Sequence, residues 1–197
     1  MLWLALVLFV ALTISVLRGG RLSNLADIHL RLWWLLVVAF GLQIAADRLP
    51  DRSWADETAL GFILVSYVLL VVMVFANRDR PGMWLAGLGV LMNFTVIVLN
   101  GGMPVLAEAA KVASGFTIEP EITGSAKHLA VGPEVHLPFL ADVIPIRFAG
   151  QGQVISLGDV FLAVGLASFL EAELRRPIRW FKRGARAQAG SAMRDRG

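Results

Sequence analysis

The 197-residue sequence contains no cysteine, which excludes disulfides, thiolate nucleophiles and cysteine-based metal sites. Charged residues are also scarce, at 17%, whereas hydrophobic residues make up 57% of the chain. So much apolar side chain exceeds what a water-soluble core of this length can bury. The composition therefore predicts a single-domain protein that is solvated by lipid.

The hydrophobic residues gather in five segments: Leu2–Leu17, Leu32–Ala46, Thr58–Ala76, Met83–Leu99 and Ile155–Leu174. A bilayer core of about 30 Å requires about 20 helical residues, with about 17 as the lower limit. The segments are continuously apolar, whereas strands of a membrane barrel would alternate. We therefore predict an all-α polytopic membrane protein, with five transmembrane helices in residues 1–184 and a disordered basic tail in residues 185–197.

Positive charge is unevenly distributed among the connections between these segments. Most of the 18 lysine and arginine residues fall in the first linker, the third linker and the C-terminal tail, whereas most acidic residues fall in the other connections. The positive-inside rule then predicts an outer N-terminus and a cytoplasmic C-terminus in a bacterial inner membrane. The first segment lacks preceding positive charge, so we expect a retained helix and not a cleaved signal peptide.

The connection of residues 100–154, predicted to be extracytoplasmic, is far longer than a linker requires. Pro104 is suited to begin a short helix that runs through Val112. In residues 143–148, Val143, Pro145 and Arg147 alternate with Ile144, Ile146 and Phe148, and Gly150-Gln-Gly152 and Val154-Ile155 follow, which predicts a β-hairpin that leads into the fifth helix. In the first linker, Ser23 or Asn24 is expected to cap a short helix before the second span.

Two acidic residues flank the predicted hairpin. Asp142 precedes it, and Asp159 lies at the outer end of the last helix, where an ionisable side chain is a functional hypothesis by default. A hairpin returns its two ends to one place, so both carboxyl groups should meet near the outer leaflet. One of two close carboxyl groups keeps its proton, which suits aspartyl peptide hydrolysis with an acid and a base. The structural alternatives are a helix N-cap for Asp159 and an ordinary loop acid for Asp142.

The stretches Ala141-Asp-Val-Ile and Ser156-Leu-Gly-Asp-Val-Phe-Leu-Ala-Val-Gly165 resemble the C-terminal motifs of lipoprotein signal peptidase. The resemblance implies that Asp142 and Asp159 form a catalytic dyad that faces outward. The chain departs from that family at Asn100-Gly-Gly-Met-Pro104, which lacks the expected Asp-Arg, and at Ser156 and Gly158, which replace Asn and Ala.

Over its whole length, the chain resembles an uncharacterised bacterial integral-membrane family whose members have no assigned activity. The residues that carry this resemblance are Gly20-Arg-Leu-Ser-Asn-Leu-Ala-Asp27, Asn100-Gly-Gly-Met-Pro104, Asp142-Val-Ile-Pro145 and Ser156-Leu-Gly-Asp159. Asn100 and Ser156 therefore join the two aspartates as candidate site residues.

Three functions remain open: an outward-facing intramembrane aspartyl hydrolase, a non-catalytic membrane accessory or lipid-binding protein, and a small transporter. The expected partners are membrane lipid and a lipidated or membrane-inserted substrate or partner protein. No cofactor or metal is expected, and the basic tail is too short to predict binding to nucleic acid. Gln43 and Asn93, inside the second and fourth spans, are expected to form interhelical hydrogen bonds.

Overall fold

The computed structural model describes residues 2–50, 54–115, 128–148 and 150–176. Each predicted apolar segment forms a helix: α1 (Leu2–Leu17), α2 (Trp34–Asp47), α3 (Ala55–Ala76), α4 (Met83–Asn100) and α6 (Leu157–Leu174). The predicted tail, residues 185–197, lies outside the described residues. Two of these helices, α3 and α4, are long and apolar enough to cross a membrane, and α1 and α2 are apolar but shorter.

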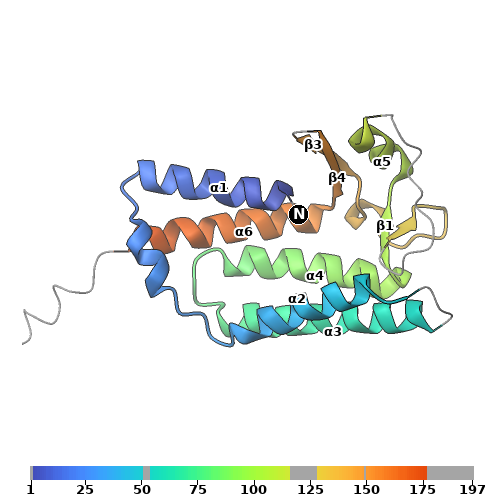
Figure 1. Ribbon diagram of the computed structural model, residues 1–197, viewed down its shortest axis with the longest axis horizontal. Helices are drawn as coiled ribbons and strands as arrows, with labels where there is room; N and C mark the ends of the chain where they lie inside the picture. Colours follow the sequence, from blue (N-terminus) through green and yellow to red (C-terminus); the bar gives the residue numbers. More distant parts are fainter. Residues whose placement is uncertain (1, 51–53, 116–127, 149, 177–197) are drawn as a thin grey trace, which may run out of the picture.

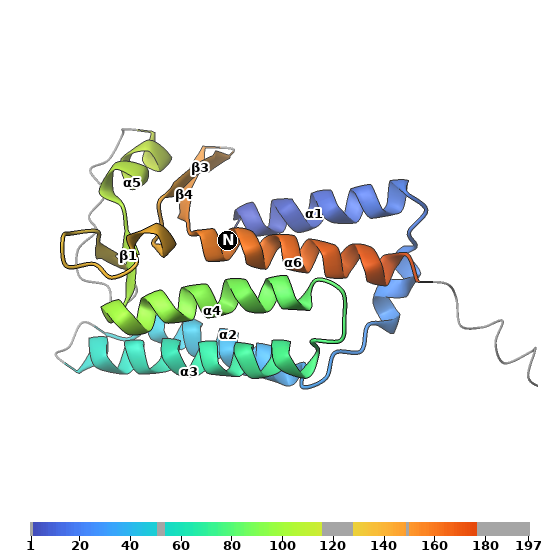
Figure 2. The same ribbon diagram turned by 180° about the vertical axis from the view of Figure 1, so that it is seen from behind.

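The five helices pack side by side in the order α1, α6, α4, α3 and α2. Seen along the helix axes, the linker from α1 to α2, the turn from α3 to α4 and the end of α6 lie at one end of the bundle (Figures 1 and 2). A short 3₁₀ helix, η1 (Leu22–Asp27), belongs to that linker. The connection from α2 to α3 and everything between α4 and α6 lie at the opposite end. We call these the η1 end and the strand end.

The strand end contains β1 (Met103–Val105), α5 (Ala107–Ser114), β2 (His128–Ala130), η2 (Pro138–Leu140), β3 (Ile144–Phe148) and β4 (Gln151–Ile155). Strands β3 and β4 form the predicted antiparallel hairpin, with Phe148 opposite Gln151 at its tip. The parallel pairing of β1 with β2 has no counterpart in the sequence prediction.

The predicted helix from Pro104 to Val112 is wrong at its start, because Pro104 lies in β1 and the helix begins at Ala107. The carbonyl oxygen of Pro104 accepts a hydrogen bond from the amide of Asp142 at 2.9 Å. This long-range pairing extends the backbone at Pro104 and delays the helix. A proline at such a position loses nothing as a donor, since only its carbonyl is used.

Small residues allow α4 and α6 to approach each other until their backbones touch. A Cβ atom added at Gly89 would lie 2.3 Å from the carbonyl oxygen of Gly158, and one at Gly165 would lie 2.2 Å from the amide nitrogen of Ala86. Gly82 faces the carbonyl oxygen of Gly165 in the same way. The two helices are therefore antiparallel and in backbone contact, the packing that small residues permit between membrane helices. We call these residues the glycine seam.

Apolar residues are both buried in the core and exposed on the outer faces of the helices. Many buried helical residues are small, such as Ala39, Ser66 and Ala163, while large apolar side chains remain on the surface. Phe9 is 65% exposed and Trp84 is 67% exposed. Exposed apolar surface of this extent is typical of a face that contacts lipid or another protein.

The glycine seam predicts a position-specific response to an added methyl group. We expect Gly89→Ala to lower the free energy of unfolding by about 1–3 kcal/mol, because the methyl group overlaps the backbone of α6. Gly61→Ala in α3 is the control, since nothing lies within 4 Å of its added Cβ, and it should be neutral or stabilising by up to about 1 kcal/mol. Thermal unfolding in detergent micelles measures both, and equal effects would contradict the seam.

Candidate functional site

The backbone of Asp142 is held in place by β1. Its amide donates to Pro104, and its carbonyl oxygen accepts a hydrogen bond from the amide of Leu106, each at 2.9 Å. One residue later, the amide of Val143 donates to the carbonyl oxygen of Ile155, where the hairpin closes. Asp142 therefore sits where the strand that leaves α4 meets the base of the hairpin that leads into α6.

The hairpin returns the chain to the first turn of α6. The hairpin ladder ends where Ile144 pairs with Ile155, one residue before the N-cap of α6. Ser156 is the N-cap of α6 and accepts a hydrogen bond from the amide of Asp159 at 3.0 Å. Asp159 in turn accepts from the amide of Ser156 at 3.1 Å, which completes a capping box. The N-cap is therefore Ser156, and Asp159 is its partner three residues later.

Asn93 of α4 joins this capping box from the neighbouring helix. Its side-chain nitrogen donates to Asp159 Oδ1 at 2.8 Å, and its oxygen accepts from the Ser156 hydroxyl at 2.8 Å. Gly158 makes this contact possible, because a Cβ there would lie 2.0 Å from the Asn93 oxygen. Both carboxyl oxygens of Asp159 thus act as hydrogen-bond acceptors.

The Asp142 side chain has a different environment. It is 8% exposed, and its Oδ1 has no hydrogen-bond partner within the described part of the chain. Burial, and secondarily the charge of Asp159, raise the pKa of Asp142 to about 8. Asp142 therefore keeps its proton at neutral pH, which makes it a buried acid beside a carboxylate.

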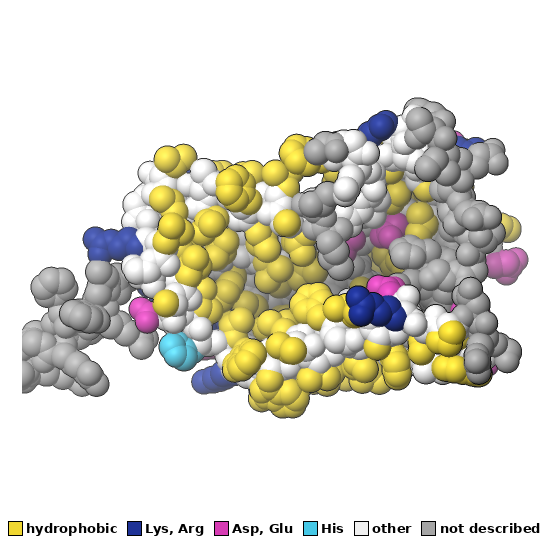
Figure 3. All heavy atoms as spheres, viewed as in Figure 1, with side chains coloured by type: hydrophobic (Ala, Val, Ile, Leu, Met, Phe, Trp, Pro, Cys, Tyr) yellow, Lys and Arg dark blue, Asp and Glu magenta, His cyan; other side chains and the backbone are white. Residues whose placement is uncertain are grey.

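The two aspartates line one cavity of about 600 Å³, within the range of small-molecule sites. All five long helices contribute to its walls, together with β1 and β4. Trp3 of α1 and Phe40 of α2 are among the contributions of the two outermost helices. Along α4 the lining runs from Met83 to Ile97, about 21 Å of helix at about 1.5 Å per residue. Figure 3 shows the corresponding hollow, walled mainly by hydrophobic side chains.

Polarity within the cavity is confined to the part between the middle of the long helices and the strand end. The polar lining residues there come from every long helix except α1, and from the loop elements: Gln43, Tyr67, Asn93, Asp142, Gln153 and Asp159. Toward the η1 end the lining is apolar, as at Leu30, Met73 and Phe169. None of the described lining residues is basic. The cavity is therefore long and mostly apolar, and we call the part lined by Asp142 and Asp159 its acidic head.

The predicted site residues fall into two groups. Asp142 and Asp159 share the cavity, and Ser156 belongs to the hydrogen-bonded network around Asp159. Asn100 lies elsewhere: its side chain exchanges hydrogen bonds with the backbone of His136 and ties the end of α4 to the loop. Asn93 was predicted only as an interhelical partner, yet it also faces the cavity, and its place inside an apolar span was the available signal.

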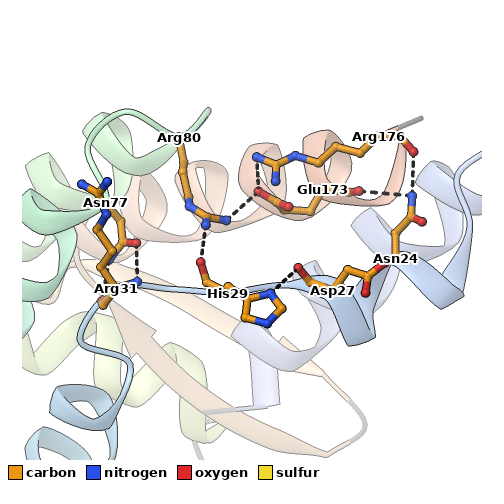
Figure 4. A network of polar contacts seen from close by, with 8 residues as sticks. All are labelled: Asn24, Asp27, His29, Arg31, Asn77, Arg80, Glu173 and Arg176. Atoms are coloured by element: carbon orange, nitrogen blue, oxygen red, sulfur yellow. Dashed lines mark hydrogen bonds and ion pairs between the residues drawn. The ribbon is translucent and has the colours of Figure 1, made fainter. Parts of the chain in front are cut away.

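A second polar cluster lies at the η1 end (Figure 4). Glu173 is 2% exposed and pairs with Arg80 at 3.0 Å and with Arg176 at 2.8 Å. Arg80 also donates to the carbonyl oxygen of His29. Every charge at the centre of this cluster has an opposite partner, which is the condition for a stable buried ion pair. We interpret this cluster as a structural clamp.

Two asparagines complete the clamp. Asn77 is fully buried and exchanges hydrogen bonds with the backbone of Arg31 at 2.8 Å in each direction. Asn24 was expected to cap the short helix of its own linker, and that prediction is wrong: its side chain donates to the carbonyl oxygens of Leu174 and Arg176, at 2.9 Å each. It caps the C-terminus of α6 because the unpaired carbonyls there need donors.

The fold and the site together define a helical protein with a long apolar cavity and a pair of acids at one end. Residues 27–170 match the family described as "Family of unknown function (DUF5317)", and the chain belongs to this family. An uncharacterized protein from Thermotoga maritima is 29% identical over 165 residues, which cover 83% of this chain and 87% of the relative. No solved structure matches. The expected membership of a family without assigned activity is confirmed.

The protonation of Asp142 predicts a pH dependence of stability. Its pKa rises from an ordinary 3.8 to about 8 on folding, so folding takes up a proton between these values. The free energy of unfolding should therefore fall as pH rises from about 4 to about 8, by at most about 1.4 kcal/mol per pH unit. Asp142→Asn cannot ionise and should remove this slope. Chemical denaturation at several pH values measures it, with Glu108→Gln, an exposed site, as the control.

The clamp predicts unequal roles for two neighbouring acids of α6. Glu173→Ala leaves Arg80 without its carboxylate partner in a mostly buried position, so we expect a loss of about 3–5 kcal/mol. Glu171→Ala removes only solvent-exposed pairs with Arg18 and Arg175, which contribute about 0–1 kcal/mol. Thermal unfolding of the two variants compares them, and similar losses would argue against the clamp.

Proposed function

We propose that the protein crosses the membrane five times, with its N-terminus and strand end outside and its C-terminus in the cytoplasm. Support comes from the row of five apolar helices, whose outer faces carry exposed residues such as Phe9, Val37 and Phe75. The basic linkers and the end of α6 share the η1 end, as the positive-inside rule requires of a cytoplasmic face. The acids of the cavity then lie on the side toward the outer surface, and its apolar lining extends toward the cytoplasmic end.

Within this frame, we propose that the protein is an intramembrane hydrolase of the aspartyl type. The observation that carries the proposal is that one cavity is lined by two differently held acids, the buried Asp142 and Asp159, which is fixed by hydrogen bonds from Asn93 and Ser156. Two titratable groups whose environments separate their protonation states are the usual equipment of acid–base catalysis. The local resemblance to lipoprotein signal peptidase points to the same two residues.

The chemistry assigns one role to each aspartate. Asp159 accepts a proton from a water molecule, whose oxygen attacks the carbonyl carbon of an acyl bond. Asp142 donates its proton to the carbonyl oxygen, which gives a tetrahedral intermediate. When the bond to the leaving group breaks, Asp159 gives the leaving group the proton it took from water, and the proton on the former carbonyl oxygen returns to Asp142 as the C=O bond forms again. Asn93 and Ser156 are positioning residues, because their hydrogen bonds fix the Asp159 carboxylate. Activity should fall as pH rises through about 8, where Asp142 loses its proton.

A second candidate is a non-catalytic lipid-binding protein, which the long apolar part of the cavity favours. In that case both acids serve only to orient a bound head group. The two candidates differ in one measurable respect, which is whether a covalent bond is broken.

We therefore expect hydrolysis of membrane peptides to depend on both aspartates. The probes are synthetic peptides with one apolar spanning segment, with and without an N-terminal acyl chain, in phosphatidylcholine vesicles. In ¹⁸O-labelled water, mass spectrometry should detect one heavy oxygen in each new carboxyl group. Asp142→Asn and Asp159→Asn should each reduce the rate by about 100-fold or more.

The control variant is Glu108→Gln, which alters an exposed acid of α5 and should retain the wild-type rate. Circular dichroism and membrane insertion establish that each variant folds. Cleavage at the wild-type rate by both aspartate variants would falsify the assignment, and absence of cleavage by the wild type would favour the lipid-binding candidate.

A further inference from the structure

The acidic head of the cavity has no basic side chain beside it among the residues that the structure describes. Within the described residues, no lysine, arginine or histidine lines the cavity or forms an ion pair with Asp142 or Asp159. The clamp at the η1 end shows how the same chain treats a buried acid that serves structure, because Glu173 there pairs with two arginines. The contrast indicates that the charge at Asp159 is left available to something outside the chain.

A buried, unpaired carboxylate is costly unless an opposite charge reaches it. Asp159 is only partly buried and faces the cavity, and Asp142 beside it carries an Oδ1 without a partner within the described residues. An anionic head group such as a phosphate would meet a like charge there, and no basic residue in the described part of the chain lines the cavity to offset it. An ammonium group would find a carboxylate and several oxygen acceptors at the same end of the cavity.

The rest of the cavity defines what this head group is attached to. The lining from Met83 to Ile97 follows most of α4, and it is apolar on the side toward the η1 end. Trp3 and Leu4 of α1 and Leu36 and Phe40 of α2 form its two borders, and these helices are the two ends of the packed row. A long chain can thus lie along α4 and α6 after entering sideways, without any separation of the glycine seam.

We propose that the cavity binds an apolar chain that carries an ammonium group and discriminates against anionic head groups. This inference deepens the proposed function, on which it rests for the identity of the substrate site. The ammonium lies against Asp159 and the chain extends toward Met83 and Phe169. The same chemistry is supplied by an aliphatic amine or by a lysine next to an apolar peptide segment, and the test separates the two.

The test uses probes that contain no cleavable bond. Dodecylamine, dodecanol and dodecyl phosphate are titrated at about pH 7 into the full chain in phosphatidylcholine nanodiscs, with empty nanodiscs as the partitioning control. We expect dodecylamine to bind at least about tenfold more tightly than dodecanol, and dodecyl phosphate to bind most weakly. A spanning peptide with one lysine near its outer end is compared with its acetyl-lysine form, to show whether a peptide source is accepted.

Two variants separate this inference from the proposed hydrolysis. Asp159→Asn removes the charge and should abolish the preference for the amine. Asp142→Asn should keep the preference, because Asp142 is already uncharged at neutral pH, although it should abolish hydrolysis. The control Glu108→Gln should change neither. Should Asp159→Asn fail to fold, the comparison of probes on the wild type still decides.

Equal affinity of the wild type for the amine and the alcohol, or tighter binding of the phosphate, would overturn the inference. If the wild type hydrolyses peptides but shows no preference for the amine, this inference alone is refuted. An intact amine preference without any hydrolysis refutes catalysis and leaves the binding site standing.

Discussion

The contact between α4 and α6 determines where every group of the candidate site lies. Because Gly89 and Gly158 allow the two backbones to touch, Asn93 is brought within 2.8 Å of both Ser156 and Asp159. A larger residue at Gly158 would occupy the place of the Asn93 side-chain oxygen. The polar network around Asp159 is thus a consequence of close helix packing, and the packing in turn depends on the absence of side chains along the seam.

Two acids on α6, Asp159 in its first turn and Glu173 in its last, show how the surroundings decide the role of a carboxylate. Glu173 has two arginine partners and lies in a closed cluster (Figure 4). Asp159 accepts hydrogen bonds from the neutral donors of Asn93 and Ser156 and borders a cavity with a second acid. The first arrangement stabilises the junction of three helix ends. The second leaves an electrostatic requirement that a ligand can meet.

The long helices and the hairpin could be predicted from sequence because each depends on local signals. Continuous apolar runs mark the helices, and alternation around Gly150 and Gly152 marks the hairpin. The predicted hairpin also explains why Asp142 and Asp159, in the first turn of α6, line the same cavity. The role of Pro104 could not be predicted, because its strand pairs with residues that are distant in the chain. The same holds for Asn24, whose partners are the carbonyl oxygens at the end of α6.

The cavity itself was beyond prediction from sequence, since it depends on which faces of five helices turn toward one another. The sequence pattern does not distinguish whether an apolar residue such as Met73 or Phe169 contacts lipid, another helix or a ligand. The acids were recognisable because a charge in an apolar segment is unusual. The two acids that line the cavity could therefore be predicted from the sequence, whereas its long apolar part could not.

The glycine seam also restricts how the molecule can move. Helices whose backbones are in contact cannot slide past each other without collisions between main-chain atoms, so α4 and α6 behave as one rigid spine. The helices at the edges of the row, α1 and α2, are the elements left to adjust. A bulky ligand would then enter by outward movement of α1 and α2, while α4 and α6 stay in place. Asp159 on α6 would keep its hydrogen bonds to Asn93 and Ser156 throughout.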